Sequence, residues 1–152
     1  MRAVVTRVSS ASVSIGGTVE GAIEQGFLVL LGVGPGDTEA VCDKLAEKIC
    51  NLRVFEDENG RMNLSLEQVG GALLVVSQFT LYADTSSRRP GFTGAARPDL
   101  AVPLYERFME QCRRRGFQVE HGTFGADMQL ASVNDGPVTI LFDTDKNGAG
   151  RA

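Results

Sequence analysis

Two short runs of consecutive apolar residues decide which architectures this chain can adopt. One run covers residues 27–33 and the other covers residues 72–76. Both have the length of a strand, and both are shorter than most buried helices. An unbroken apolar run is typical of a strand that is covered on both faces, as in the centre of a layered sheet. We therefore expect both runs to form central strands of a sheet.

The neighbouring segments predict further strands around these two. Residues 2–15 alternate polar and apolar side chains, which is typical of a strand with one buried face. Gly16 and Gly17 predict a tight turn, and residues 19–23 would then form the returning strand of a hairpin. Further strands are expected in residues 117–124, 128–133 and 138–142.

Two segments have the apolar spacing of amphipathic helices. The first covers about residues 38–53, with Thr38 as its N-cap, and the second covers about residues 99–115, where Gly116 would end it. Two helices with this many strands predict an α/β fold, one domain over residues 1–145 with mixed sheets and the helices packed on one face. The polar, glycine-rich residues 146–152 are expected to form a flexible tail.

The net charge and the cysteine content limit which partners the chain can bind and which cellular compartment it occupies. The net charge of −4 and the pI near 5.0 argue against a broad, non-specific nucleic-acid surface. A small basic patch stays possible, at Arg88 and Arg89 or at residues 113–115. The three cysteines include no C-x-x-C pair, so we expect reduced thiols. Without an apolar run of membrane-spanning length or a secretory signal, the sequence predicts a cytoplasmic protein with no membrane partner.

The sequence contains no clear match to the standard catalytic, metal-binding or cofactor-binding motifs. A Ser-His-Asp triad would have to use the single histidine, His121, and nothing near it in the sequence marks it as catalytic. No His and Cys spacing suits a metal, so we expect none. The segment "GVGPGD", residues 32–37, lacks the third glycine of a dinucleotide-binding fingerprint, and Pro35 interrupts it. We therefore expect no cofactor.

Two segments remain as candidates for a site. "SQFTLYAD", residues 77–84, places polar side chains after a buried strand, where they could line a site or merely cap the strand. "VNDGPVTILF", residues 133–142, contains the step Gly136-Pro137. Its residues predict a hairpin turn, but a Gly-Pro step could also present bare backbone atoms to a ligand. The local sequence leaves both alternatives open.

Taken together, these motifs resemble those of the D-aminoacyl-tRNA deacylase family, over essentially the whole chain. The motifs that carry the resemblance are Ser77-Gln78-Phe79-Thr80, "FGADM" at residues 124–128 and "NDGPVTI" at residues 134–140. The segments "MRAVVTRVSSASV", "RVFEDENGRMNLSL" and "SRRPGF" also match the family pattern in order and position. One departure is Ala83, where glycine is common in the family.

The resemblance implies a three-layer β/β/α domain that works as a homodimer. The family hydrolyses the ester that joins a D-amino acid to the 3′ end of tRNA, and it also accepts glycyl-tRNA mischarged on tRNA(Ala). The resemblance places Gly136-Pro137 in the cis form, where its backbone would reach into the partner's pocket and block an L-side chain. A backbone barrier suits this task, because attractive contacts cannot recognise every D-side chain.

The resemblance also assigns roles around that pocket. Ser77, Gln78 and Thr80 would form the catalytic set, and Phe79 would lie near the terminal adenosine. Met128 would lie at the pocket. Separately from the resemblance, the acidic net charge leads us to expect only a small contact at the acceptor end of the tRNA. Its phosphates would be bound by Arg88, Arg89 or Arg97, and the alternative is that these arginines are solvated loop charges.

Four alternatives stay open at this stage, three of them catalytic mechanisms. The residues provide no convincing general base, and the family is held to use the neighbouring 2′-hydroxyl of the tRNA. Thr80 as a nucleophile is the competing view, although its hydroxyl would need an adjacent base. A general hydrolase using Ser77 and His121, or an RNA-binding module without catalysis, are the remaining alternatives.

Overall fold

The computed structural model describes residues 1–146. Its elements, in chain order, are β1 (Arg2–Ile15), β2 (Thr18–Ile23), β3 (Gly26–Gly32), α1 (Glu39–Cys50), β4 (Arg53–Glu56), β5 (Met62–Ser65), β6 (Ala72–Ser77), the 3-10 helix η1 (Phe79–Tyr82), α2 (Pro98–Arg114), β7 (Val119–His121) and β8 (Gln129–Asp143). The predicted tail at residues 146–152 lies, apart from Lys146, outside the described residues.

The main sheet has the strand order β2-β1-β3-β6-β7, and β8 also pairs with β1. The pairs β3–β6 and β6–β7 are parallel and the other pairs are antiparallel, so the sheet is mixed, as predicted. β4 and β5 form a separate two-stranded sheet. The expected central strands are β3 and β6, which lie side by side.

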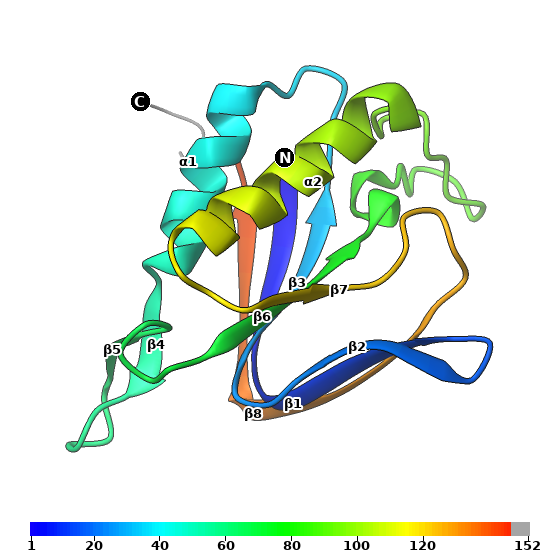
Figure 1. Ribbon diagram of the computed structural model, residues 1–152. Coiled ribbons are helices and arrows are strands. Elements are labelled where there is room, and N and C mark those ends of the chain that lie inside the picture. Colours follow the sequence, from blue (N-terminus) through cyan, green and yellow to red (C-terminus); the bar gives the residue numbers. More distant parts are fainter. Residues whose placement is uncertain (147–152) are drawn as a thin grey trace.

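The long strand β1 bends and folds the main sheet onto itself (Figure 1). Its first part pairs with β3, through Val8, and its last part, from Ala11, pairs with β2. β8 follows β1 along both parts. The folded sheet therefore supplies two of the three layers.

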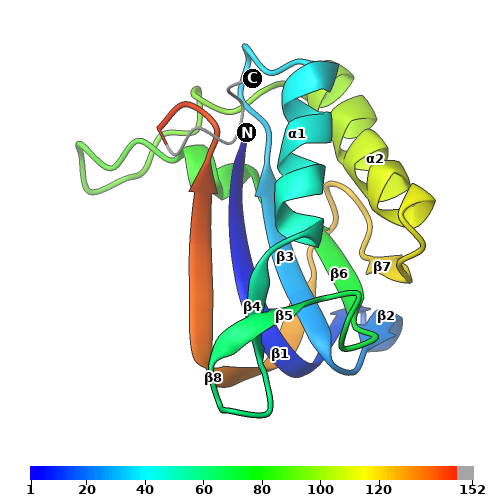
Figure 2. The same ribbon diagram turned by 90° about the vertical axis from the view of Figure 1, so that its left-hand side faces the viewer.

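Helices α1 and α2 lie next to each other on one face of the sheet and form the third layer (Figure 2). Phe27, Val29 and Leu31 face the main core beneath these helices, whereas Leu28 lies in a second core between the folded halves of the sheet. Both faces of β3 are thus covered, which explains its unbroken apolar run. The predicted three-layer β/β/α fold is confirmed.

The helices and the first hairpin agree closely with the sequence. The Thr38 hydroxyl accepts a hydrogen bond from the Val41 N–H at 3.3 Å, so Thr38 is the N-cap of α1. Gly16 and Gly17 have φ values of 56° and 83°, which permit the tight turn between β1 and β2. α1 ends at Cys50, a few residues earlier than expected.

The predicted hairpin turn at residues 133–142 is wrong. The structure has one continuous strand, β8, where two strands with a turn between them were expected. Both parts of β8 pair with β1 in the same antiparallel direction. The turn-forming residues occupy a bulge in that strand, because extra residues can leave a sheet locally while the flanking pairs continue. The predicted strand at 117–124 is also shorter, since only Val119–His121 pair with β6.

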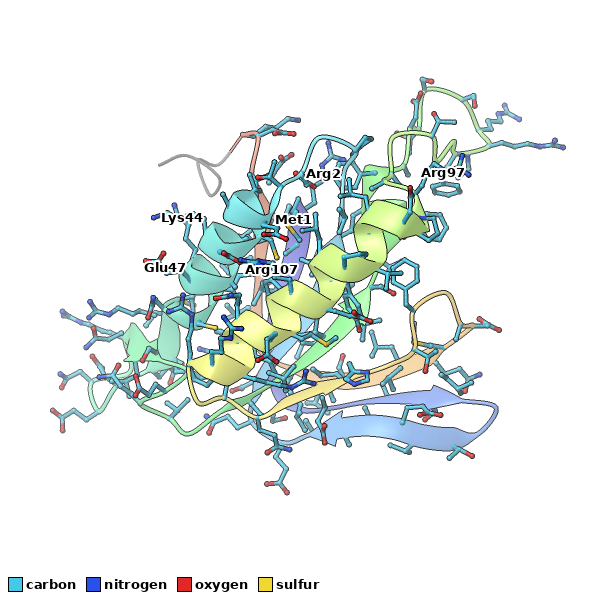
Figure 3. The ribbon with its side chains drawn as sticks, turned by 45° about the horizontal axis from the view of Figure 1, so that its top comes forward. Met1, Arg2, Lys44, Glu47, Arg97 and Arg107 are labelled. Atoms are coloured by element: carbon cyan, nitrogen blue, oxygen red, sulfur yellow. The ribbon has the colours of Figure 1, made fainter. Side chains whose placement is uncertain are left out.

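The contact between α1 and α2 includes the three cysteines and a charged group. All three cysteines are free thiols and buried, and Cys50 Sγ lies 3.6 Å from Cys112 Sγ. Burial raises the pKa of the Cys42 thiol to about 12. Arg107 spans the two helices (Figure 3) and binds both carboxylate oxygens of Asp43 at 2.8 Å, which lowers the pKa of that carboxyl.

Among the helices of residues 1–146, there is none with both the length and the apolar composition that a membrane span requires.

Candidate active site

The first candidate segment lies where β6 leaves the sheet. Ser77 pairs with Leu31 of β3, and the N–H of Gln78 still donates to the Leu31 carbonyl at 2.8 Å. The chain then turns at once into η1. Ser77, Gln78 and Thr80 are half-buried there, and the Phe79 side chain is 54% exposed. The strand fixes the backbone while its end opens to solvent, as the sequence predicted.

The segment "GVGPGD" makes room for this strand end. A Cβ on Gly32 would lie 3.0 Å from the Gln78 carbonyl, and a Cβ on Gly34 would lie 3.0 Å from the Tyr82 ring. The Asp37 carboxylate accepts a hydrogen bond from the Gly34 N–H at 2.6 Å and shapes the loop. These glycines therefore let η1 pack closely on β3.

The hydroxyl of Thr80 is bound by an amide. Gln78 Nε2 donates a hydrogen bond to Thr80 Oγ1. His121 Nδ1 lies 2.6 Å from the Gly122 carbonyl, and no hydrogen bond joins this ring to Ser77 within residues 1–146. In the same part of the chain, no carboxylate or imidazole is hydrogen-bonded to Thr80. An amide has no useful basicity, so Gln78 orients the hydroxyl and does not activate it.

Met128 lies on the face of the sheet that is opposite to the helices. It packs against the second core, which contains Leu74 and Val76 of β6, and its sulfur lies directly over Gly122. Val76 is two residues before Gln78 in the chain. Met128 therefore covers the sheet close to the open end of β6.

Gly136 and Pro137 form the exposed tip of the bulge in β8. Asn134 pairs with Val8 of β1 and Thr139 pairs with Thr6, so residues 135–138 leave the ladder. The Asn134 side chain closes the bulge, because its Oδ1 accepts from the Val138 N–H at 2.9 Å. The peptide bond between Gly136 and Pro137 is cis.

Arg7 holds the base of this bulge from inside the protein. Its side chain is only 5% exposed. Its Nε donates to the Asp135 carbonyl at 2.9 Å and its Nη1 donates to the Val54 carbonyl at 2.6 Å. Val138, the next residue after Pro137, is anchored in the main core. The bulge is thus fixed at its base while its tip faces outward.

Sequence reasoning missed Arg7 and Asn134. A signal for Arg7 exists, because it follows the buried residues Ala3 and Val5 on the alternating strand β1. A charged residue at an apolar position of a strand must find partners inside. Asn134 offers no such signal, because a side chain that closes a bulge looks like any turn residue.

The two candidate segments are far apart within one chain. Arg7, beside the bulge, is opposite Phe27 of β3, whereas Ser77 is opposite Leu31. This difference of four residues corresponds to ~13 Å along the strands, and β8 and β6 are separated by three strand spacings of ~4.8 Å each. A single chain therefore does not bring Gly136-Pro137 to the Ser77–Thr80 segment.

Two basic clusters were candidates for RNA contacts. Arg88 and Arg89 are exposed in a loop that extends from the body of the protein near Arg97, at the start of α2 (Figure 3). The other cluster, at the end of α2, has partners within the chain: Arg113 donates to the Val119 carbonyl and Arg114 lies 3.5 Å from Glu110. The exposed loop is the better candidate.

A sizeable cavity lies elsewhere. It has a volume of about 760 Å³ and is lined mainly by α2, the end of β7 and the loop after β7. Its lining includes His121, Arg113 and Arg114, and none of Ser77, Gln78, Thr80 and Met128. In residues 1–146, no group of three His, Cys, Asp or Glu side chains is placed to hold a metal ion.

Comparison with known proteins finds relatives over nearly the whole chain. A family model described as D-Tyr-tRNA(Tyr) deacylase matches residues 4–143. The D-aminoacyl-tRNA deacylase of Symbiobacterium thermophilum is 58% identical over 147 residues, 96% of this chain and 97% of that protein. The protein of the same name from Thermus aquaticus is 55% identical over 152 residues, 99% of this chain and all of that protein.

Two solved structures have a fold similar to that of this chain. The c-Myc DNA unwinding element binding protein has a TM-score of 0.88 and 41% identity, and the match covers 94% of this chain and 98% of that one. A probable eukaryotic D-amino acid tRNA deacylase has a TM-score of 0.82 at 18% identity, with 93% and 97% covered, which shows a shared fold.

The family match and the relatives over nearly the whole chain identify an enzyme of the hydrolase class that acts on aminoacyl-tRNA esters. The chain belongs to the D-Tyr-tRNA(Tyr) deacylase family.

Proposed function

We propose that this enzyme hydrolyses the ester of D-aminoacyl-tRNA, and of glycyl-tRNA mischarged on tRNA(Ala), as a cytoplasmic homodimer. Each active site would combine Ser77, Gln78, Phe79, Thr80 and Met128 of one protomer with the Gly136-Pro137 tip of its partner. The observation that carries this proposal is the separation of the two segments within one protomer. A tip that is rigidly held, exposed and far from its own pocket is well suited to another chain's pocket.

The outer edge of β8 supports the proposed dimer. β8 pairs with β1 on one edge, and no strand covers its other edge within the described residues. It also carries exposed apolar side chains, with Val133 56% and Leu141 68% exposed. An edge strand with apolar side chains on its surface is typical of an interface. The same strand carries the tip, so this interface would place the tip against the partner.

The proposed tip selects the enantiomer by exclusion. An L-side chain would point at the Gly136-Pro137 backbone, whereas a D-side chain would point away from it and could vary in size. Rejection by a fixed barrier gives specificity without any attractive contact to the side chain. Glycine has no side chain, so the barrier does not reject it.

The proposed chemistry needs little from the protein beyond orientation. Water adds to the ester carbonyl, and the ester C–O bond breaks to give a free amino acid and the 3′-hydroxyl of the tRNA. The neighbouring 2′-hydroxyl of the substrate would position or activate that water. This agrees with the absence, within residues 1–146, of an acid or base hydrogen-bonded to Thr80. Gln78 and Thr80 would then orient the substrate.

Replacing Thr80 with alanine separates the two mechanisms. Under substrate assistance we expect the variant to keep at least about a tenth of kcat, because it loses one hydrogen bond worth ~1 kcal/mol. A nucleophilic Thr80 would instead cost about a thousandfold or more. The measurement is single-turnover hydrolysis of a D-aminoacyl-tRNA. Thr80→Ser, which keeps the hydroxyl, is the matched control, and a near-complete loss confined to Thr80→Ala would establish the nucleophile.

Recognition of the tRNA would use a small footprint. The chain carries a net charge of −4, so a homodimer carries about twice that charge, and a broad electrostatic surface is not available. We propose that Arg88 and Arg89 contact phosphates at the acceptor end.

The function itself is tested with matched esters on one tRNA. We expect rapid release of D-tyrosine and of glycine, and release of L-tyrosine at least about a hundredfold slower, because the barrier is steric. The measurement is the loss of radiolabelled amino acid from tRNA at equal enzyme concentration. Tight binding of uncharged tRNA without any hydrolysis would instead identify an RNA-binding module.

A further inference from the structure

A pair of exposed aromatic rings lies beside the open end of β6. The ring centroids of Phe79 and Phe92 are 5.2 Å apart, and their planes are inclined by 74°. Phe79 is 54% exposed and Phe92 is 37% exposed. Exposed aromatic rings usually mark a contact surface, because covering them with a partner removes apolar surface from water, which is favourable. The proposed function uses Phe79 and leaves Phe92 without a role.

The position of Phe92 is fixed by the loop that carries the arginines. Asp84 and Gly91 form a backbone bridge, with N–H to carbonyl distances of 2.7 Å and 2.9 Å. Phe92 follows this bridge directly, and the Ala95 N–H donates to its carbonyl at 3.1 Å. Arg88 and Arg89 occupy the loop that the bridge closes. One short segment therefore joins an aromatic ring to two exposed positive charges.

This combination is what proteins use to hold single-stranded nucleic acid. Aromatic rings stack on bases, and neighbouring cationic side chains bind the phosphates between them. The rings of Phe79 and Phe92 are nearly perpendicular, so bases stacked on each of them cannot stack on one another. The pair therefore suits a strand end whose last two bases are splayed apart.

We propose that Phe92 forms a second nucleotide subsite. Its ring would stack on the base that precedes the terminal adenosine, while Arg88 and Arg89 bind the phosphates of the same strand end. This inference rests on the proposed function, in which Phe79 lies near the terminal adenosine. Phe92 would then let the enzyme distinguish a nucleic-acid substrate from a simple adenosine ester.

The test compares D-tyrosyl esters of adenosine and of the trinucleotide CCA. The wild type should prefer the trinucleotide by about tenfold in kcat/KM, the effect of stacking one base. Phe92→Leu, which keeps an apolar side chain against Phe79, should lose most of this preference and hydrolyse the adenosine ester at nearly the wild-type rate. Phe92→Tyr keeps the ring face and should behave like the wild type.

Two results would overturn the proposal. An equal fall on both esters would mean that Phe92 only supports Phe79, and an unchanged preference would mean that Phe92 does not contact the substrate. Binding of uncharged CCA and of adenosine to the wild type and to Phe92→Leu is measured in parallel. If no D-ester is hydrolysed, the proposed function fails, and the subsite still stands or falls on whether Phe92→Leu weakens CCA binding alone.

The arginines give an independent readout. The double variant Arg88→Ala and Arg89→Ala should flatten the salt dependence of CCA binding and leave adenosine binding unchanged, because adenosine carries no phosphate. An unchanged salt dependence would remove the arginines from the subsite.

Discussion

The variant Gly136→Ala should lose at least about a hundredfold of the preference for D- over L-aminoacyl-tRNA, because a displacement near 1 Å at a reacting site has an effect of this size. Gly136 has a φ of +133°, which side chains rarely allow. A Cβ there would lie 2.8 Å from Val138 Cγ2 and 3.0 Å from Arg7 Nη2. The tip must therefore move away from its present position. The measurement is the ratio of kcat/KM for matched D- and L-tyrosyl-tRNA.

A matched control is available at another glycine with positive φ. Gly60, in the turn between β4 and β5, has a φ of +73° and nothing within 4 Å of a built Cβ. Gly60→Ala should cost ~1 kcal/mol of stability and leave the D/L ratio unchanged. An unchanged ratio in Gly136→Ala as well would refute the barrier.

Mixing two variants of the proposed dimer tests whose pocket the tip enters. Gly136→Ala is combined with Gln78→Trp, a variant whose own pocket is filled. If the tip acts across the interface, the mixed dimer contains one intact pocket facing one intact tip, and selective D-ester hydrolysis returns on mixing. If the tip acts within its own chain, no combination is intact and mixing restores nothing.

The second large effect is expected for Arg7→Met. This substitution leaves the carbonyls of Asp135 and Val54 without their buried donor. We expect the free energy of unfolding to fall by about 2–3 kcal/mol, the size of a hydrogen bond to a charged group. We also expect loss of the D/L preference in the folded fraction, since the base of the bulge is no longer held. Denaturant unfolding and the same kinetic ratio measure the two effects.

Arg53→Met is the control for Arg7→Met. Arg53 also donates to a backbone carbonyl, that of Asn63 at 2.7 Å, but it is exposed. Its loss should change stability by less than about 1 kcal/mol and leave selectivity intact. A stable, fully selective Arg7→Met would show that the bulge keeps its shape without the buried guanidinium.

The layered fold was predictable because its signals are local. The apolar runs of β3 and β6 report burial on both faces, and the caps and glycines of α1 and α2 mark helix ends within a few residues. The open end of β6 was predictable for the same reason, because Ser77, Gln78 and Thr80 directly follow an apolar run.

The bulge in β8 was not predictable in this way. Asn134, Asp135, Gly136 and Pro137 have the composition of a hairpin turn, and whether a chain reverses there depends on which strand it pairs with next. That partner is β1, more than a hundred residues away in sequence, and the donor that fixes the bulge, Arg7, comes from the same strand. Long-range pairing therefore outweighed the local turn preference.

The pairing on the two flanks of the bulge allows the length of its tip to change. Asn134 and Thr139 are both paired with β1, so the register on either side is set independently of residues 135–138. A residue gained or lost at the tip would alter how far the loop projects without shifting the rest of the strand. A change in the length of the tip would thus alter the proposed barrier and leave the pairing of the sheet as it is.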